Sequence, residues 1–529
     1  MIKIYRRLDR WLDRHIAILL FLFLMLILRL PNLFEPYWYG DEGMYLTIGN
    51  ALRDGKILYL DIIDHKTPLI YYFAILPGQT YFRLAMIAWM GLATINFFHL
   101  AKTFFRRTPL IHLATLIFVL LTSLPALEGN IPNGELWVMG FALLGWRLAL
   151  AAPAYRRLIE NKSISQTSAT QSKRWLFLSG VSFGLAILTK VPAVFDMAAV
   201  FIPVWLLICS ALAKQKPSSL AAIGRQTWAL IWPIILGTFT PIFFSIIYFA
   251  WRGAGGAYLD YGLLYNFRYV KSWGLPFHHP LLIFLFSLKG KIILTAIITI
   301  LISLNRKKTV WQIAAIWLLF ALFGATLSNR PYPHYLLQIV PPLALFIAAI
   351  FQKSPKPAKI AHYPLFLIGN ASIVILLFAA ITLLKFGFYP TIDYYRRFGQ
   401  LLNRQITFDQ YGQKFNPLAV DNQKAADIIR RSGVKQIFIW GTNPMLYALS
   451  QTYPVGRFTV SFHIKDFQAQ KETVANLNAN PPLFIVTMND EREWLPGLDQ
   501  LLENGYLPNY NFQHFILWKK FNNAAQLAF

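Results

Sequence analysis

The sequence predicts an α-helical polytopic membrane protein of about eleven transmembrane helices, followed by a small α/β domain. Three observations lead to this prediction. Of the 529 residues, 56% are hydrophobic and 14% are charged, whereas a soluble domain carries about 25% charged residues. The apolar residues form long spans that are separated by short basic clusters. From Phe386 onward the composition changes to that of a soluble domain. We therefore expect a membrane domain over 1–385 and a second domain over 386–529.

The net charge of +26 restricts the class of partner. A strongly basic protein can bind nucleic acid, but here the Lys and Arg residues lie between apolar spans. This is the distribution of a membrane protein whose basic loops face the cytoplasm, so we expect membrane lipid and no nucleic acid as a partner. The single cysteine, Cys209, excludes both a disulfide framework and a thiolate metal site. The first apolar span is long and no small-residue cleavage site follows it, so we predict no cleavable signal peptide.

Hydropathy and charge together predict the topology. A span of about 18 residues crosses roughly 30 Å of hydrocarbon. The basic head over 1–15 keeps the N-terminus in the cytoplasm, and an odd number of spans then places residues 37–72 and the C-terminal domain on the extracytoplasmic side of the plasma (inner) membrane. The predicted spans are 16–33, 82–104, 109–127, 136–154, 175–189, 192–213, 227–250, 281–304 (interrupted by Lys289 and Lys291), 310–327, 335–351 and 363–384.

The C-terminal domain shows an alternation of strand and helix patterns. We predict a helix over 424–431, strands over 436–440, 483–487 and 515–518, and a turn at Gly441 that leads into a helix ending near Leu449. This alternation indicates a small α/β domain. The single glycine of the turn makes no phosphate loop, so the domain is assigned no chemistry. No internal repeat is visible, which weighs against inverted-repeat transporters.

The outer loop over 35–81 carries the most concentrated candidate chemistry. Asp41 and Glu42 are adjacent and lie among aromatic residues, and Asp64-His65-Lys66-Thr67-Pro68 forms a second polar group. Short surface helices are expected over 43–52 and 69–76. Carboxylates beside a membrane are costly to bury, and perturbed acids cluster at functional sites, so a functional interpretation is favoured over a solvated loop.

Four further groups of residues lie in loops of the membrane domain. Asn133 and Glu135 open one span, and Glu135 can instead simply stabilise the start of that helix. Lys190 lies in a tight turn between two spans, where a structural ion pair is an equal alternative. Arg330 and His334 lie one helical turn apart in the segment RPYPHYLLQ. His278 and His279 lack a neighbouring carboxylate, so we predict no metal ligand there.

Four of these motifs are similar to motifs of a known family. Gly40-Asp41-Glu42, the segment from Asp64 to Leu69, Asn133-x-Glu135 and Arg330 to Gln338 resemble the GT-C superfamily of glycosyltransferases that use polyprenyl-phosphate sugars. The similarity is to bacterial members related to protein O-mannosyltransferases and to the lipid A aminoarabinose transferase. It implies a GT-C-like fold, Asp41 as the base, and substrate contacts from Asp64, His65, Asn133, Glu135 and Tyr335. Thr67 departs from the family, which often has a second proline there.

The residues can also be interpreted from the chemistry of the reaction. A sugar linked through C1 to a polyprenyl phosphate already has a good leaving group, so transfer needs a base for the acceptor hydroxyl and positive charge for the phosphate. Asp41 suits the base, and Glu42 suits an orienting or sugar-binding partner better than a second base. Lys66, Arg330, His334 and Lys190 suit the donor phosphate, although Lys66 can instead only extend to the membrane interface, and Arg330 and His334 can cap a loop.

We therefore predict a glycosyltransferase, with inversion at C1, whose acceptor is a glycan, a lipid or a protein hydroxyl. The alternative is a non-enzymatic flippase or transporter of lipid-linked sugars, which would place functional charges near the middle of the bilayer, with Lys289 and Lys291 as candidates. No cofactor is assigned, and the sequence leaves open a divalent cation.

Overall fold

The computed structural model describes residues 2–159, 164–212, 220–271, 273–303, 309–352 and 363–521. The basic clusters at Lys214, at Arg306 and at Lys353 lie outside these ranges. The chain forms two compact units. The helical unit comprises Met1–Leu30, Met86–Ser245 and Phe267–Thr391, and the α/β unit comprises Pro31–Ala85, Ile246–Asn266 and Ile392–Phe529.

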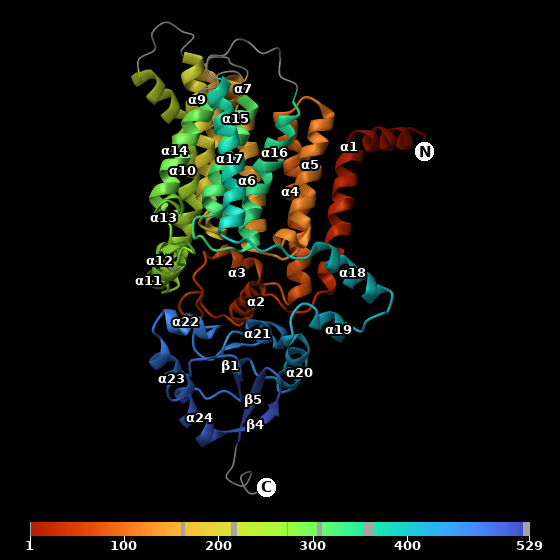
Figure 1. The fold of residues 1–529 in the computed structure, drawn as a ribbon, viewed down its shortest axis with the longest axis vertical. Helices are drawn as coiled ribbons and strands as arrows, with labels where there is room; N and C mark the ends of the chain where they lie inside the picture. Colours follow the sequence, from red (N-terminus) through yellow and green to blue (C-terminus); the bar gives the residue numbers. More distant parts are fainter. Residues whose placement is uncertain are drawn as a thin grey trace. The chain divides into compact units, whose positions relative to one another are not determined.

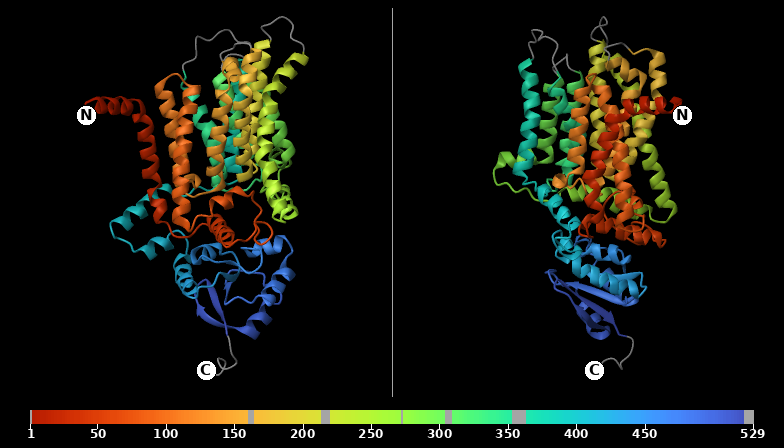
Figure 2. Two further views of the ribbon diagram at one scale, coloured as in Figure 1. Left: turned by 180° about the vertical axis from the view of Figure 1, so that it is seen from behind. Right: turned by 90° about the vertical axis from the view of Figure 1, so that its right-hand side faces the viewer.

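Long helices make up the helical unit, and Figures 1 and 2 show most of them side by side and roughly parallel. Those wholly or mainly in this unit are α1 (Ile2–Arg29), α4 (Gln79–Phe104), α5 (Thr108–Ser123), η2 (Pro125–Leu127), α6 (Gly134–Ala151), α7 (Pro153–Ile159), α8 (Gln166–Thr189), α9 (Ala193–Leu212), α10 (Leu220–Trp251), α12 (Tyr265–Lys271), α13 (Pro280–Phe286), α14 (Leu288–Ser303), α15 (Thr309–Ala325), η4 (Pro333–Ile339), α16 (Val340–Ile350) and α17 (Tyr363–Leu383).

The length and composition of these helices fit a membrane protein. Among the described residues, five helices are long and apolar enough to cross a bilayer, or six if the bent pair α13 and α14 is one span. Four shorter apolar helices lie over 108–123, 193–206, 311–325 and 368–383. Each predicted span coincides with a helix, but α8, at the fifth predicted span, is 24 residues long without being apolar enough to count as a spanning helix. The number eleven therefore stays a prediction.

The surface of the helical unit is apolar where a soluble protein would be charged. Phe239, Phe243 and Phe244 on α10 are each about 60% exposed (62%, 59% and 63%). On α17, Ile375 and Phe378 are 65% and 63% exposed. Large apolar surfaces of this kind are normally covered, and lipid is the covering that these long helices imply.

The span predicted over 281–304, with an interruption at Lys289 and Lys291, contains a bend. Helices α13 and α14 meet at Ser287 with an angle of 71°. Lys291 is buried, with 8% of the residue exposed. Its ammonium donates to the carbonyl of Thr326 and, at 2.7 Å, to Oδ1 of Asn329. These acceptors follow the last turn of α15, so the lysine satisfies polar groups at a helix end.

The α/β unit contains a five-stranded sheet of order β2-β1-β3-β5-β4. Its strands are β1 (Gln436–Trp440), β2 (Tyr453–Pro454), β3 (Phe484–Met488), β4 (Tyr506–Asn511) and β5 (Phe515–Lys520). Strands β2, β1 and β3 are parallel, whereas β5 is antiparallel to both β3 and β4. The predicted strands 436–440, 483–487 and 515–518 correspond to β1, β3 and β5. The short β2 and the polar β4 lack the apolar pattern that would have predicted them.

Helices cover both faces of this sheet (Figure 1). Successive residues of a strand point to opposite faces, so Phe438 and Trp440 pack with α23 and α24, whereas Ile437 and Ile439 pack with α20 and α21. The helices of this unit are η1 (Leu30–Phe34), α2 (Gly40–Arg53), α3 (Leu69–Phe73), α11 (Gly255–Ala257), the π-helical η3 (Tyr258–Leu264), α18 (Thr391–Leu402), α19 (Phe408–Gln413), α20 (Leu418–Arg431), α21 (Pro444–Ser450), α22 (Ser461–Asp466), α23 (Gln470–Ala479) and α24 (Leu498–Gly505).

The loop region 31–85 and the sheet belong to the same compact unit, which the sequence did not predict. Helix α2 packs on α21 so closely that a Cβ on Gly43 would lie 2.9 Å from the amide nitrogen of Met445. The amide of Ile63 donates to the carbonyl of Arg457 at 2.8 Å, and Ile63 forms a parallel bridge with Phe458. The candidate loop is therefore held by the same domain that follows Ile392.

Candidate functional site

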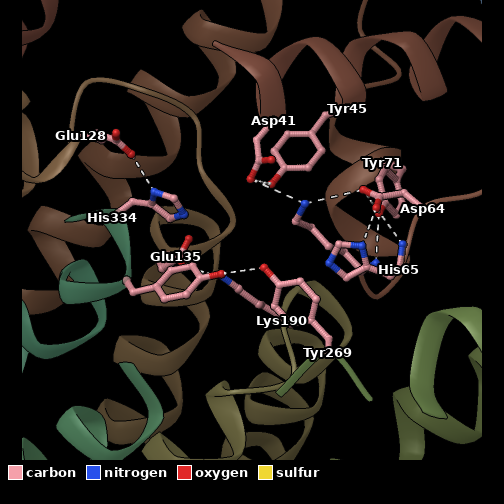
Figure 3. Close-up of polar contacts among 12 residues, drawn as sticks. Asp41, Tyr45, Asp64, His65, Tyr71, Glu128, Glu135, Lys190, Tyr269 and His334 are labelled. Carbon is pink, nitrogen blue, oxygen red and sulfur yellow. Dashed lines mark hydrogen bonds and ion pairs between the residues drawn. The ribbon is translucent and has the colours of Figure 1, made fainter. Parts of the chain in front are cut away.

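Asp41 lies in the first turn of α2, where the exposed amide groups of a helix stabilise a negative charge. Its side chain is 27% exposed. The Tyr45 hydroxyl, one helical turn later, donates to Oδ2 of Asp41 at 3.2 Å, and the Lys66 ammonium lies 3.5 Å from the same oxygen (Figure 3). Asp41 is thus an oriented carboxylate that solvent and a substrate can reach.

Lys66 is held from both its side chain and its backbone. Its Nζ atom lies 3.6 Å from Oδ2 of Asp64 and 5.1 Å from the centre of the Tyr45 ring. The Tyr59 hydroxyl donates to the Lys66 carbonyl at 2.7 Å, and the Lys66 amide donates to the Tyr71 hydroxyl at 3.2 Å. The ammonium therefore occupies a fixed position between two carboxylates.

Asp64 is fully buried and keeps its charge through its neighbours. It accepts from the His65 amide at 2.7 Å and from the Tyr71 hydroxyl at 2.8 Å (Figure 3). Burial alone would raise the pKa of Asp64, but the Lys66 ammonium and the adjacent His65 outweigh it and hold the pKa well below its usual range. A buried anion of this kind stabilises the charged form of Lys66 in return.

Glu42 has a different environment from its neighbour Asp41. It is 1% exposed, and its carboxylate accepts from Arg83 at 2.8 and 2.7 Å and from the Gln79 amide at 3.1 Å. Arg83 also lies 3.4 Å from Glu35. Both oxygens of Glu42 are therefore used within the protein, and they anchor α2 to the start of α4.

His65 and Asp64 meet a third potential metal ligand, His463 of α22. One ligand atom from each of these residues lies within 4.8 Å of the others, and all three residues are buried. Neither ring nitrogen of His463 has a hydrogen-bond partner, and burial lowers its pKa to about 3. Two imidazoles and a carboxylate are a ligand set that suits a divalent ion such as Zn²⁺, with a fourth position open. The sequence predicted no metal ligands because His463 lies about 400 positions from His65.

The helical unit brings together a second set of predicted residues. Lys190, at the end of α8, forms an ion pair with Glu135 in the first turn of α6 (Figure 3). The Lys190 ammonium also lies 4.0 Å above the Tyr335 ring, and the Tyr335 and Tyr269 hydroxyl oxygens are 3.2 Å apart. Glu135, Lys190 and Tyr335 thus form one contiguous group.

His334 and Arg330 each have partners that the sequence did not indicate. Nδ1 of His334 lies 2.6 Å from Oε2 of Glu128 (Figure 3). The Arg330 guanidinium lies 4.1 Å above the Tyr269 ring and 4.9 Å from the Trp273 ring. Glu128 has a left-handed backbone with φ of 56°, a conformation that is costly for glutamate and is concentrated at functional positions.

Asn133 precedes α6 and is 1% exposed. Both polar atoms of its side-chain amide are buried without a hydrogen-bond partner. Since an unpaired buried amide is costly, a polar ligand would stabilise this position.

The turn that contains Lys190 and Pro192 is held by Gln338. The Gln338 side-chain amide donates to Asp196 at 2.7 Å and to the Pro192 carbonyl at 3.0 Å.

The structure thus groups Asp41, Asp64, His65 and Lys66 in the α/β unit, and it groups Glu135, Lys190 and Tyr335 in the helical unit. Glu42 faces away toward Arg83. The sequence analysis missed Glu128 and His463, along with the tyrosines at 45, 71 and 269. A left-handed Glu128 leaves no signal in the sequence except the Gly129 that follows it, and nothing in the sequence distinguishes these three tyrosines from the rest of the 25.

No family model matches the sequence, and no curated protein matches it. Among solved structures, the chain is similar to ArnT from Cupriavidus metallidurans bound to undecaprenyl phosphate, with a TM-score of 0.52 and 13% identity over 95% of this chain and 98% of that chain. More distant are two structures of the Archaeoglobus fulgidus oligosaccharyltransferase. The apo form has a TM-score of 0.43 and 13% identity over 89% of this chain and 69% of that chain. The complex with an inhibitory peptide and a dolichol-phosphate has a TM-score of 0.42 and 11% identity over 97% and 75%. The predicted resemblance to the GT-C superfamily is confirmed at the level of the fold, which this chain shares with ArnT over nearly the full length of both.

Proposed function

We propose that this protein is an integral membrane glycosyltransferase that transfers a sugar from a polyprenyl-phosphate-linked donor to an acceptor hydroxyl. The observation that carries the proposal is the pairing of the accessible Asp41 carboxylate with the Lys66 ammonium, 3.5 Å apart, with buried Asp64 behind the ammonium. A base and a phosphate-binding cation are the two groups that this reaction requires. The fold supports the proposal, because the similar ArnT structure contains undecaprenyl phosphate.

The proposed reaction is a single displacement at C1 of the sugar. Asp41 accepts the proton of the acceptor hydroxyl, whose oxygen forms the new bond to C1 while the bond from C1 to the phosphate oxygen breaks. The electron pair leaves with the polyprenyl phosphate, and the Lys66 ammonium stabilises the charge on that phosphate. Attack opposite the leaving group inverts the configuration at C1.

The neighbours of these two residues have positioning roles in this proposal. Tyr45 orients the Asp41 carboxylate through its 3.2 Å hydrogen bond, and Asp64 keeps Lys66 charged and in place. Glu42 acts on Asp41 only through the position of α2, because both of its oxygens are bound by Arg83 and Gln79. The donor-phosphate roles predicted for Arg330, His334 and Lys190, and the substrate contacts predicted for His65, Asn133, Glu135 and Tyr335, stay predictions.

A transferase is favoured over a flippase by the environment of Lys291. A transporter would use this lysine as a mobile or substrate-binding charge within the bilayer. Here its ammonium donates to the Thr326 carbonyl and to Asn329, where α15 ends. This contact supplies a hydrogen-bond donor to polar groups that follow the end of α15, so the buried lysine is explained by a structural role.

The test is sugar transfer by the purified protein in nanodiscs, with a short-chain polyprenyl-phosphate sugar as donor. We expect Asp41→Asn to lower turnover by about 10²- to 10⁴-fold, the usual contribution of a general base, with donor affinity within a few-fold of wild type. Lys66→Ala should also weaken donor binding about 10- to 100-fold, since a charge-assisted hydrogen bond contributes about 1.5–3 kcal/mol.

Asp54→Asn is the matched control, because Asp54 lies in the same loop region but contacts Lys435 at 3.8 Å and not Lys66. It should transfer at the wild-type rate. Wild-type turnover in Asp41→Asn would remove Asp41 from the base role, and full donor affinity in Lys66→Ala would remove Lys66 from the phosphate.

A further inference from the structure

The carboxyl edge of the sheet in the α/β unit carries a feature that the proposed reaction does not use. From β1 the chain passes to β2 on one side and then to β3 on the other side of β1. The carboxyl ends of β1 and β3 are therefore the point where the strand order reverses. In open α/β sheets, this is the position where ligands bind.

A pocket of about 780 Å³ opens at this position. Trp440, the last residue of β1, lines it together with Glu493 and Trp494 from the segment that follows β3, and with Lys465, Gln468 and Gln470 from the end of α22 and the start of α23. Its volume is within the range of ligand sites in proteins, about 300–1,000 Å³. Aromatic rings combined with a few fixed polar groups are also typical of such sites.

The segment after β3 is fixed in place while the Trp494 ring remains exposed. The Trp440 indole donates to the Glu493 carbonyl at 3.0 Å, and Lys465 binds Glu491 at 2.7 Å and Glu493 at 3.2 Å. Trp494 itself is 41% exposed. Gln468 has a left-handed backbone with φ of 54°, which is strained for glutamine and is concentrated at functional positions. A rigid frame that presents an exposed indole is organised for binding.

Trp494 also lines a second pocket, of about 250 Å³. This pocket contains two further aromatic residues, Tyr506 and Trp518, and two acids of α24, Asp499 and Glu503. Asp499 lies in the first turn of α24, where the helix amide groups stabilise a negative charge, and Glu503 follows four positions later on the same helix face. Neither carboxylate contacts a cation among the residues that the structure describes. Both carboxylates are exposed, so they can accept hydrogen bonds from a ligand.

The composition of the two pockets identifies the class of ligand. Flat indole and phenol rings present a negative face to the weakly positive C–H bonds of a sugar ring, and amides and carboxylates bind its hydroxyl groups. The lining residues include two cations, Lys465 and Lys471, against three anions, Glu493, Asp499 and Glu503. This balance offers no excess positive charge to a phosphate or an acidic glycan, and it favours a neutral ligand.

We propose that the two pockets that Trp494 lines bind a neutral oligosaccharide, whose chain passes over the Trp494 ring. This inference rests on the proposed function. The oligosaccharide is part of the glycan acceptor, and the C-terminal domain selects it by its neutral surface, which is rich in hydroxyl groups.

The experiment measures binding of labelled oligosaccharides to the full-length protein in nanodiscs by fluorescence polarisation. The probes are maltotetraose, cellotetraose and chitotetraose, with tetragalacturonate as the acidic comparison and a serine/threonine-rich peptide as the polypeptide comparison. We expect at least one neutral probe to bind saturably and more tightly than the other two classes. Trp494→Ala should weaken that binding at least about fivefold, as expected for an aromatic anchor.

Tyr510→Ala is the matched control, because Tyr510 is 49% exposed on β4 and lines neither pocket. It should bind the probe as wild type does, and Trp494→Ala should unfold at the wild-type temperature, since its ring is exposed. The inference is overturned if no neutral probe binds, if the acidic glycan or the peptide binds best, or if Trp494→Ala keeps full affinity.

Asp41→Asn separates this inference from the proposed function. It should bind the neutral probe with wild-type affinity while its sugar transfer falls by about 10²- to 10⁴-fold. Probe binding that depends on Trp494 in a wild-type protein without transferase activity would leave the oligosaccharide site intact and reject the proposed reaction. Transfer of sugar to another class of acceptor, without probe binding, would support the proposed reaction and reject the oligosaccharide site.

Discussion

At the residue scale, Asp41 and Glu42 show how adjacent identical functional groups acquire different roles. On a helix, successive side chains point about 100° apart, so two neighbouring acids cannot face the same environment. Asp41 faces Tyr45 and Lys66 and stays accessible, whereas Glu42 is enclosed with Arg83 and Gln79. One carboxylate is therefore available to a substrate, and the other is used to hold the helix.

This difference predicts opposite results from the same chemical change. Glu42→Gln should lower the free energy of unfolding by about 3 kcal/mol, because the buried Arg83 guanidinium loses its nearest carboxylate and keeps the more distant Glu35, at 3.4 Å, to balance its charge. Asp41→Asn should leave stability nearly unchanged and remove turnover. Thermal unfolding of the two purified variants, measured side by side with transfer activity, checks this. Equal unfolding temperatures would show that the Glu42–Arg83 pair contributes little.

Asp64, His65 and His463 predict that the protein binds a divalent metal ion. We expect about one equivalent of Zn²⁺ to remain after gel filtration, measured by elemental analysis, and to be lost in His463→Ala. His514→Ala is the matched control, since His514 contacts Asp421 at 3.1 Å and lies outside the cluster. Equal zinc content in wild type and His463→Ala would exclude a site at these three residues.

At the element scale, α2 is positioned by close backbone contacts on two sides. A Cβ on Gly49 would lie 2.0 Å from the Ala74 carbonyl oxygen, just after α3, and a Cβ on Gly43 would meet the backbone of α21. Helix α2 carries Asp41, and the segment before α3 carries Lys66. The spacing between base and cation therefore depends on how closely these helices approach.

Gly49→Ala should separate α2 from α3 and impair both stability and transfer. We expect a loss of about 1–3 kcal/mol in the free energy of unfolding, as for other overpacked contacts, with turnover reduced more than donor affinity. Gly40→Ala on the same helix is the control, because nothing lies within 4 Å of the added Cβ. Thermal unfolding and transfer assays distinguish the two. Wild-type behaviour in Gly49→Ala would mean that the contact relaxes without cost.

At the scale of the whole molecule, the α/β unit combines segments that are far apart in the sequence. Residues 31–85 and 392–529 share one compact unit, which supports the prediction that both lie on one side of the membrane. The basic clusters between spans predict that this side is extracytoplasmic.

Cysteine labelling in intact cells tests this topology. In a Cys209→Ser background, Lys56→Cys and Gln470→Cys should both react with a membrane-impermeant maleimide, because Lys56 and Gln470 are both at least partly exposed. Lys173→Cys, at the start of a predicted span, should react only after the membrane is permeabilised. Labelling of only one of the first two positions would require a different number of spans.

The sequence by itself determined the class of this protein and much of its secondary structure. Apolar spans and turn residues are local properties of the chain, so they predicted the helices of the helical unit and strands β1, β3 and β5. They also pointed to Asp41, Lys66, Glu135 and Lys190, because charged residues beside apolar spans are rare and conspicuous. The resemblance to GT-C glycosyltransferases rested on these local motifs, and the similarity to ArnT confirmed it at the level of the fold.

Only the tertiary structure decided what each of these residues contacts. The separation of Glu42 from Asp41, the encounter of His463 with Asp64, and the pairing of Glu128 with His334 are contacts across tens to hundreds of positions. Such contacts depend on how helices and strands pack, and packing involves side chains from the entire unit. For the same reason, the sequence alone could not indicate that Trp494 lines a pocket. The pairing of β1 with β3 brings Trp494 and Trp440 together at the carboxyl edge of the sheet.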